Sequence, residues 1–477
     1  MKTPHYTDDP FRIVVLGDFS GRSSRGVVAS ASQISSRGTL RVDRDEVDTA
    51  IAGIGPELHI VLDAGSPMLT VRFDQLDDFH PDRLVERLPV FRQLRALREE
   101  VTQRGEQAPT RHRQMPPRAD ASASALAKGS LLDLIIDGDS PSTAQDRSAR
   151  PPDELASFIK QAVAAHVVAQ PSAEQAELIG QIDSVIEAMM RALLHHPEFQ
   201  TLEASWRSMD FLLRRLETDD QLRVYLIDLS FAELAADLGA PGGASGSAIR
   251  KLLDCRTSPG TTDARTLVVA NYMYGPGDVE LLSQLAALGR AVGAPVIAGA
   301  SPLLAGAASI ATQPDPDDWD IALPAAWEEL RRSEDSVWLA LALPRLFLRL
   351  PYGKSTNACT LRFEEFGDGP TLHASYLWGT ASVACALVVA EGIARDGSPG
   401  THGTIDGLPF HVIVGAGEAV QVPCAEAFLT QRAVAKLLDL GLTPLASMRD
   451  GDSVRAPRIQ SIATPPHALA FAVGGPR

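Results

Sequence analysis

The turn at residues 17–24 carries the residue types that come closest to phosphate-binding chemistry. Its sequence is Gly17-Asp-Phe-Ser-Gly-Arg-Ser-Ser24, and it follows an apolar run. A P-loop needs four residues between its glycines and a lysine before the Ser or Thr, so that backbone N–H groups and an ammonium surround the phosphates. Here three residues separate Gly17 from Gly21, Arg22 replaces the lysine, and Asp18 adds negative charge. We therefore interpret the segment as a strand-ending turn, with a nucleotide-binding enzyme as the remote alternative.

Gly415-Ala-Gly417 also follows a predicted strand and looks like the start of a dinucleotide-binding fingerprint. That fingerprint requires a third glycine, and Val420 occupies its position here. A hairpin or loop turn is therefore the interpretation that we prefer.

His195-His196 could be imagined as a metal-binding pair. Adjacent residues on a helix point roughly 100° apart, so the two imidazoles would not share one ion easily. Pro197 follows directly, which places the pair at a helix C-terminus, where a cation is favoured. The sequence has no Cys/His cluster with zinc spacing, so we expect no metal site.

Nucleophilic and carboxylate catalysis have no support in the sequence. A G-x-S-x-G elbow is absent. The adjacent acids Glu364-Glu365 and Asp77-Asp78 are interpreted as solvated surface charges. The four cysteines are widely spaced and are expected to be buried thiols without a disulfide: Cys255, Cys359, Cys385 and Cys424. We therefore expect neither an enzyme nor a cofactor.

Bulk composition is that of a soluble globular protein of about two to four domains. The 477 residues are 45% hydrophobic and 22% charged, and the formal net charge is −16. Such a surface repels phosphates and anionic lipid, so we expect neither nucleic acid nor a membrane as a partner. No apolar stretch approaches bilayer length and the N-terminus lacks a signal-peptide core, which predicts a cytoplasmic protein.

Residues 1–105 are predicted to form a small α/β unit. Its strands are expected at residues 11–16, 58–62 and 68–73. A helix should then begin at Pro81, and apolar residues at spacings of four and three form one face of it: Leu84, Leu88, Phe91 and Leu94. Pro89 must kink or shift that helix, because it removes a backbone donor.

Residues 106–150 are expected to be a linker, since polar residues, Pro and Ala alternate without apolar periodicity. Within it, residues 129–137 predict a short amphipathic helix whose apolar patch is Leu131, Leu132, Ile135 and Ile136. Because linker-like sequence flanks the patch on both sides, we expect it to dock into a groove on its own fold or on a partner.

The rest of the chain predicts a helical region at residues 151–217 and an α/β domain at residues 218–477. Ser172 and Gln175 form a capping-box pattern ahead of one amphipathic helix, and Pro197 separates it from a second. These two helices are expected to form a hairpin. Strands are then expected at residues 222–228, 266–270, 295–298, 360–363 and 410–414, with helices between them. The predicted fold class is therefore α/β.

Large aromatic side chains stand out where chemistry-bearing motifs do not. They are Trp206, Trp327, Trp338, Tyr352, Tyr376 and Trp378. We interpret them first as core anchors and second as interface residues, since aromatics dominate both environments.

Two sets of segments resemble the contractile sheath proteins of bacterial type VI secretion systems. Residues 11–104 resemble the small sheath subunit through the 11–22 strand and turn and through Val71-Arg-Phe-Asp-Gln-Leu-Asp-Asp-Phe79. Residues 129–463 resemble the large subunit. The stretches that carry this second resemblance include Leu193-Leu-His-His-Pro-Glu-Phe-Gln-Thr-Leu-Glu-Ala-Ser-Trp-Arg207, Trp327–Asp335, Leu341–Gly353 and Tyr376-Leu-Trp-Gly379. Trp206, Trp327, Tyr352 and Trp378 lie in these stretches as candidate core or interface residues.

The resemblance implies a structural subunit that polymerises with other sheath subunits around an inner tube of stacked rings. It also implies baseplate components and an AAA+ disassembly ATPase as partners, and the ATPase would engage the helix that carries Leu131, Leu132, Ile135 and Ile136. In this family, exchanged β-strands link neighbouring protomers. The chain departs from the family in two ways: the ATPase helix is internal, and the usual C-terminal extension of the large subunit is missing. The second departure makes a non-polymerising cap or baseplate adaptor the alternative function.

Overall fold

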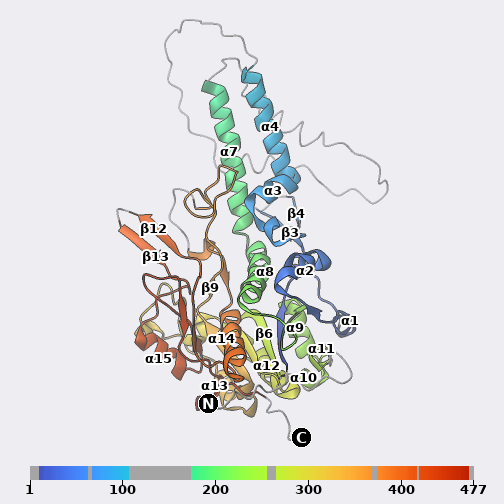
Figure 1. Ribbon diagram of the computed structural model, residues 1–477, viewed down its shortest axis with the longest axis vertical. Helices are drawn as coiled ribbons and strands as arrows, with labels where there is room; N and C mark the ends of the chain where they lie inside the picture. The colour runs from blue at the N-terminus through green and yellow to red at the C-terminus, as the bar shows by residue number, and fades with distance from the viewer. Residues whose placement is uncertain are drawn as a thin grey trace.

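The computed structural model describes residues 10–62, 67–106, 173–254, 265–366, 373–415 and 418–471. A seven-stranded sheet lies at the centre of this part of the chain (Figure 1). Its spatial order is β14 (Thr443–Pro444), β8 (Leu339–Leu343), β7 (Val296–Ala300), β6 (Arg265–Tyr274), β1 (Phe11–Gly17), β5 (Leu222–Asp228) and β2 (Leu40–Arg41). All neighbours run parallel except β2, which pairs antiparallel with β5. The predicted α/β fold class is confirmed.

Strand β1 lies in the middle of this sheet although it comes from the first residues of the chain. Phe11 is paired with Leu222 of β5 on one side and with Arg265 of β6 on the other. All of its apolar side chains are buried, as a mostly apolar run predicts for a strand covered on both faces. The first segment therefore shares one sheet and one core with residues beyond 222, and the domain boundary near residue 105 stays a prediction.

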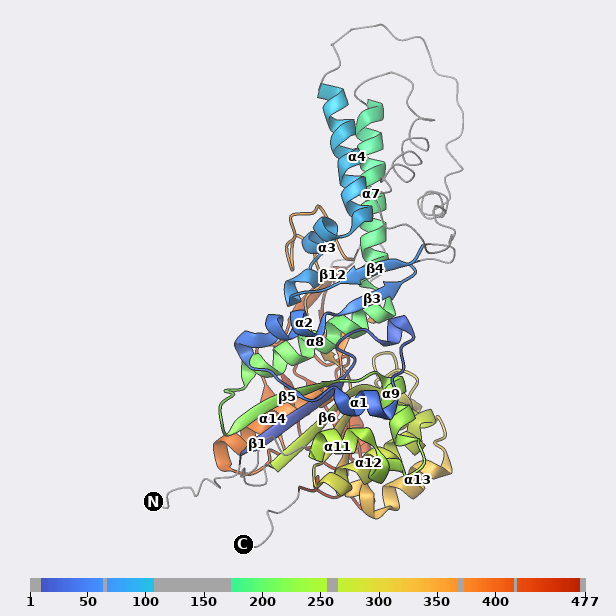
Figure 2. The ribbon, with the colours of Figure 1, turned by 90° about the vertical axis from the view of Figure 1, so that its right-hand side faces the viewer.

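Helices cover both faces of the sheet (Figure 2). One face packs against α8 (Pro197–Arg215) and α14 (Ala381–Asp396). The other packs against α9 (Phe231–Leu238), α11 (Ala248–Asp254) and α12 (Val279–Val292), with α1 (Ala31–Ser36), α10 (Gly243–Gly246), α13 (Ala325–Arg332) and α15 (Gln431–Asp439) around them. Side chains of β1 alternate between the two cores, since Ile13 and Val15 face α8 whereas Val14 and Leu16 face the second layer.

A pair of long helices, α4 (Pro89–Glu106) and α7 (Ala173–Leu194), projects away from the sheet (Figures 1 and 2). Arg98 of α4 is 2.6 Å from Asp183 of α7, and the Gln175 amide donates to the Val101 carbonyl oxygen at 2.6 Å. The expected hairpin of α7 with α8 is therefore wrong: α7 lies along α4 instead. His196 between α7 and α8 is extended, and α8 continues onto the face of the sheet that α14 also covers (Figures 1 and 2). Ser172 lies outside the described residues.

The helix predicted at Pro81 is two helices. His80 caps α3 (Pro81–Arg87), in which Pro81 is the first residue, and α4 begins at Pro89 after the extended Leu88. Pro89 thus ends one helix and starts the next, as its missing N–H requires. Before them come α2 (Val47–Ile54) and a hairpin of β3 (Glu57–Ile60) with β4 (Leu69–Arg72), which confirms both predicted strands.

Four of the five strands predicted after residue 218 are confirmed, as β5, β6, β7 and β12 (His411–Gly415). The strand expected at residues 360–363 is wrong. The backbone N–H groups of Thr360 and Leu361 donate to the Asp82 carboxylate at 2.8 and 2.9 Å, so these donors are taken by a side chain and not by a neighbouring strand. Small sheets complete the fold: β12 with β13 (Glu418–Val422), β9 (Leu346–Phe347) with β10 (Trp378–Gly379), and β11 (Gly403–Ile405) with β16 (Val454–Ala456) and β15 (Ala446–Ser447).

Candidate functional site

The carboxyl ends of β1 and β6 form the position where sheets of this kind bind ligands. Numbered along the chain, the parallel strands run in the spatial order 2-1-3-4-5-6, so the order reverses between β1 and β6. Crevices at such reversals accept phosphates and nucleotides in doubly wound proteins. The 17–24 turn lies here, directly after β1.

The chain's own carboxylates occupy the backbone donors of this turn. Phe19 and Ser20 donate their N–H groups to Asp228 at 3.0 Å each, and Arg22 and Ser23 donate theirs to Asp18 at 2.8 Å each. A phosphate would have to displace both acids. The geometry therefore supports the interpretation as a strand-ending turn over the nucleotide-binding alternative.

Position 21 of the turn requires glycine, because the backbone of β3 lies very close to it. Its φ is +72°, and a Cβ there would lie 2.7 Å from the carbonyl oxygen of Glu57 in β3. The glycine thus lets the turn lie directly on the edge of β3, where Glu57 donates its N–H to Ser20 O at 3.2 Å.

A buried ion-pair cluster joins α8 to the segment after β9. Arg349 lies 2.8 Å from Glu203 of α8 and 2.8 Å from Glu365, and all three side chains are buried. Burial by itself would raise the pKa of Glu365, but the Arg349 guanidinium and hydrogen bonds lower it to about 2. Glu365 is therefore ionised at neutral pH, and both acids are paired with arginine, as buried charges must be.

Arg207 and Tyr352 extend the cluster. Arg207 contacts Glu203 at 2.7 Å and donates to the Tyr352 hydroxyl at 3.1 Å, while Tyr352 N–H donates to Glu365 at 2.7 Å. The Arg349 guanidinium also lies 4.3 Å from the Tyr352 ring centroid. Burial raises the pKa of Tyr352 to about 12, so its hydroxyl stays protonated. Two of the stretches that carry the large-subunit resemblance meet in this cluster.

The expectation that Glu364-Glu365 and Asp77-Asp78 form solvated pairs is wrong for one member of each. Glu365 is 1% exposed and Asp78 is 2% exposed. Asp78 pairs with Arg87 and accepts the N–H of Asp74 at 2.7 Å. Adjacent residues point in different directions, so one acid of each pair turns inward to an arginine.

His195 and His196 have separate structural roles. His196 caps α8, where its Nδ1 accepts the N–H of Glu198 at 3.3 Å, and burial lowers its pKa. The neutral imidazole is thus an acceptor at a helix N-terminus, which corrects the expected cation at a helix C-terminus. His195 Nε2 lies 3.5 Å from Glu365. Among the described residues no group of three or more His, Cys, Asp or Glu is placed to hold a metal ion.

The four candidate aromatic residues are all buried but lie in different places. Trp206 is fully buried and donates its indole N–H to Phe19 O at 2.9 Å. Tyr352 belongs to the ion-pair cluster, and Trp327 lies in the core on the other face of the sheet. Trp378 packs against Phe347 beside β9 and β10. A role in partner contacts stays a prediction for these residues. Leu131, Leu132, Ile135 and Ile136 lie outside the described residues.

Two of the three cysteines that the structure describes are buried, as predicted. Cys385 and Cys424 are buried, Cys359 is partly buried, and all three are free. Burial raises the pKa of Cys385 to about 12 and that of Cys424 to about 11, so neither is a nucleophile at neutral pH. Cys255 lies outside the described residues.

The strands β12 and β13 that flank Gly415-Ala-Gly417 form an antiparallel hairpin, with Val412 opposite Gln421. Several large apolar side chains in and beside it are exposed: Phe410, Val412, Val420 and Met448. Sequence reasoning missed this surface, because a half-apolar strand looks the same whether its outer face is covered or bare. Separately, none of the described helices has the length and apolarity to cross a bilayer.

Two family models match the chain. The VipB model, described as a tail sheath N-terminal domain, matches residues 176–462. The VipA model, described as a type VI secretion system family, matches residues 5–108. A similar curated protein is the type VI secretion system sheath protein TssC1 of Pseudomonas aeruginosa PAO1, 30% identical over 305 residues. The alignment covers 60% of this chain and 61% of that relative.

Proposed function

Because the chain belongs to the tail sheath family of type VI secretion systems and joins a VipA-like to a VipB-like segment, we propose that it is a structural sheath subunit with both parts in one chain. Sheath proteins of this family are structural, and the proposal assigns this chain no reaction. Its role is to form an ordered polymer with copies of itself or with other sheath subunits.

The observation that carries the proposal is the position of β1. This strand comes from the VipA-like match, and both of its neighbours, β5 and β6, come from the VipB-like match. The two segments therefore form one folded body and not two tethered ones. Such a body is suited to act as a single protomer, since neither part could complete its sheet alone.

The β12–β13 hairpin supports polymerisation by strand addition. It forms a two-stranded sheet, so within the described residues both of its outer edges lack a neighbouring strand. The exposed side chains of Phe410, Val412 and Val420 surround these edges with apolar surface. An extended segment from a neighbouring protomer would satisfy the edge and cover that surface.

The proposal extends to the partners and the compartment that the sheath family implies. These partners are an inner tube ring protein, baseplate components and an AAA+ ATPase that engages Leu131, Leu132, Ile135 and Ile136. The cytoplasm is the proposed location, and the strongly acidic composition argues against nucleic acid and membranes as partners.

Negative-stain electron microscopy of the purified chain, with and without its cognate tube protein, tests the proposal. Filaments or tubes with a cogwheel edge are the expected result. Particles found only at tube ends would instead support the alternative function of a cap or baseplate adaptor. A protein that stays monomeric at high concentration and does not bind the tube would overturn both the sheath and the adaptor hypotheses.

A further inference from the structure

The outer edge of β4 is open. In an antiparallel pair, opposite residues alternate between exchanging hydrogen bonds and directing them outward. Glu57 and His59 of β3 direct their N–H groups outward, to Ser20 O at 3.2 Å and Ser24 Oγ at 3.2 Å. Their opposite residues are Arg72 and Thr70, which must therefore direct their backbone groups away from β3. In the described part of the chain these backbone groups have no hydrogen-bond partner.

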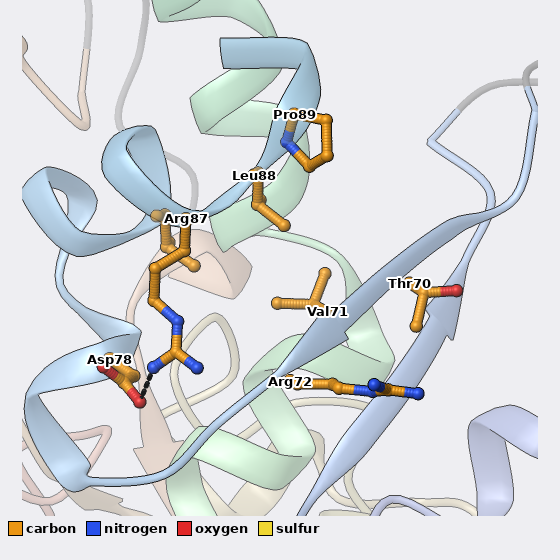
Figure 3. Close-up of a pocket in the computed structure, with 8 residues that line it drawn as sticks. Thr70, Val71, Arg72, Asp78, Arg87, Leu88 and Pro89 are labelled. Carbon is orange, nitrogen blue, oxygen red and sulfur yellow. Dashed lines mark ion pairs between the residues drawn. The ribbon is translucent and has the colours of Figure 1, made fainter. Parts of the chain in front are cut away.

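A cavity of about 250 Å³ lies along this open edge (Figure 3). Its residues come from β4, from the 3-10 helix Leu76–Phe79, from α3 and from the junction of α3 with α4, and they are Thr70, Val71, Arg72, Asp78, Leu84, Arg87, Leu88 and Pro89. Val71, Leu84 and Leu88 form a buried apolar floor, and Pro89 is exposed at the rim. A groove between a strand edge and a helix is the arrangement in which proteins bind an extended peptide by strand addition.

Residues of α3 and α4 line the cavity together with β4, and its volume of about 250 Å³ is too small for a second sheet. The occupant is therefore a single extended segment. Alternate residues of this segment must be apolar, because they lie over the apolar floor beside Val71. A residue on its other face should be acidic, because it lies opposite the exposed Arg72 guanidinium.

We propose that residues 131–137 of this chain, Leu-Leu-Asp-Leu-Ile-Ile-Asp, add to the open edge of β4 as an antiparallel strand, in place of the short helix that the sequence pattern predicts for them in isolation. This docking does not depend on sheath assembly. In the proposed register Leu134 lies beside Val71 and covers the floor, with Leu132 and Ile136 on the same face. Asp133 then lies opposite Arg72, whose side chain is 73% exposed and already pairs with Glu57.

The chain can reach the groove. It leaves the described residues at Glu106, the far end of α4, and the groove lies at the Pro89 end of that helix. The 18 residues of α4 span about 27 Å. The connecting residues 107–130 could extend to about 80 Å, which is well beyond the length of α4 that they must span.

Cysteine pairs in the full-length chain test the register. Thr70→Cys with Ile135→Cys places two residues directly opposite, whereas Thr70→Cys with Leu134→Cys places them on different faces. Thr70→Cys with Ser148→Cys controls for chance encounters. Under mild oxidation the 70–135 pair is expected to form an intramolecular disulfide at least about tenfold faster than either control, as followed on non-reducing gels and by peptide mass spectrometry. Equal rates for the three pairs would overturn the proposal, and linked dimers alone would place the segment on a second copy.

Hydrogen exchange gives a second test that needs no crosslink. Leu134→Asp is expected to speed exchange of the backbone amides of Thr70 and Arg72 about fivefold or more, because it removes their partner strand. Leu155→Asp, in the same stretch of sequence, is the matched control and should leave these amides unchanged. Ile135→Ser should speed exchange of these amides less than Leu134→Asp does, because Ile135 lies on the outer face of the added strand. Equal exchange in wild type and Leu134→Asp would contradict the docking.

Discussion

The Trp206 indole donates its N–H to the carbonyl oxygen of Phe19, which lies 187 positions earlier in the chain, at 2.9 Å. The two rings also meet edge to face, with centroids 5.1 Å apart. Phe19 belongs to the VipA-like match and Trp206 to the VipB-like match. This residue pair therefore connects the turn after β1 to helix α8 and so joins the VipA-like segment to the VipB-like segment.

Trp206→Phe should lower the free energy of unfolding by about 2 kcal/mol, because it leaves the buried Phe19 carbonyl without its donor and removes ring volume. Urea denaturation followed by circular dichroism measures the change. Trp378→Phe is the control: it loses a similar bond, to His373 O at 2.8 Å, at the less buried edge beside β10. A Trp206 variant as stable as wild type would contradict the role given to this contact.

Glu365→Gln should destabilise the chain by about 3–5 kcal/mol, since it leaves the buried Arg349 short of one counter-charge. The neighbouring Glu364→Gln is a matched control, because that side chain is exposed and should cost no more than about 0.5 kcal/mol. Thermal and urea unfolding compare the two variants. Equal losses would mean that the cluster is not a unit.

The ionised Glu365 also predicts a pH dependence. Its pKa in the folded chain is lowered from the ordinary value of 4.5 to about 2, so its contribution is full above the unfolded-state pKa. That contribution should fall away as the pH drops from about 5 toward 2. The difference in unfolding free energy between wild type and Glu365→Gln, measured at several pH values, should shrink over that window. A constant difference would exclude this linkage.

Gly21→Ala should cost about 3 kcal/mol or more, because the alanine is both strained at positive φ and too close to Glu57 O. Gly26 has a similar φ of +61°, but a Cβ there would meet no heavy atom of the described residues within 4 Å. Gly26→Ala should therefore show the conformational cost alone, about 1 kcal/mol. Melting temperatures of the two variants separate strain from collision, and equal shifts would rule out the collision.

Cutting the connection between α4 and α7 should not separate the two segments. A protease site placed between residues 107 and 172 gives an N-terminal fragment that still holds β1 between β5 and β6. The nicked chain is expected to elute from size-exclusion chromatography as one species with unchanged circular dichroism. Elution as two separate fragments would show that the shared sheet does not hold them.

Local pattern identified most strands but could not give their partners. The apolar run of β1 predicts a buried strand, yet nothing near it in sequence specifies β5 and β6, which follow more than 200 residues later. The same limit explains the failure at residues 360–363, whose backbone donors are taken by Asp82.

The sequence also could not predict which charged side chains are buried. Glu365 looks like its exposed neighbour Glu364 until Arg349 and Glu203 are seen to converge on it. The phosphate-loop question, in contrast, was answerable from spacing alone, because the turn lacks the lysine and the fourth residue between its glycines.

The central position of β1 also determines the order of events on the ribosome. This strand is synthesised well before its neighbours, because its pairing partner Leu222 follows only after 210 intervening residues, which take about 10–40 s to translate. Throughout that time a strongly apolar strand has emerged with neither neighbour present. The nascent chain is therefore exposed to aggregation until β5 and β6 emerge, and this follows from the order of strands in the sheet and not from chain length alone.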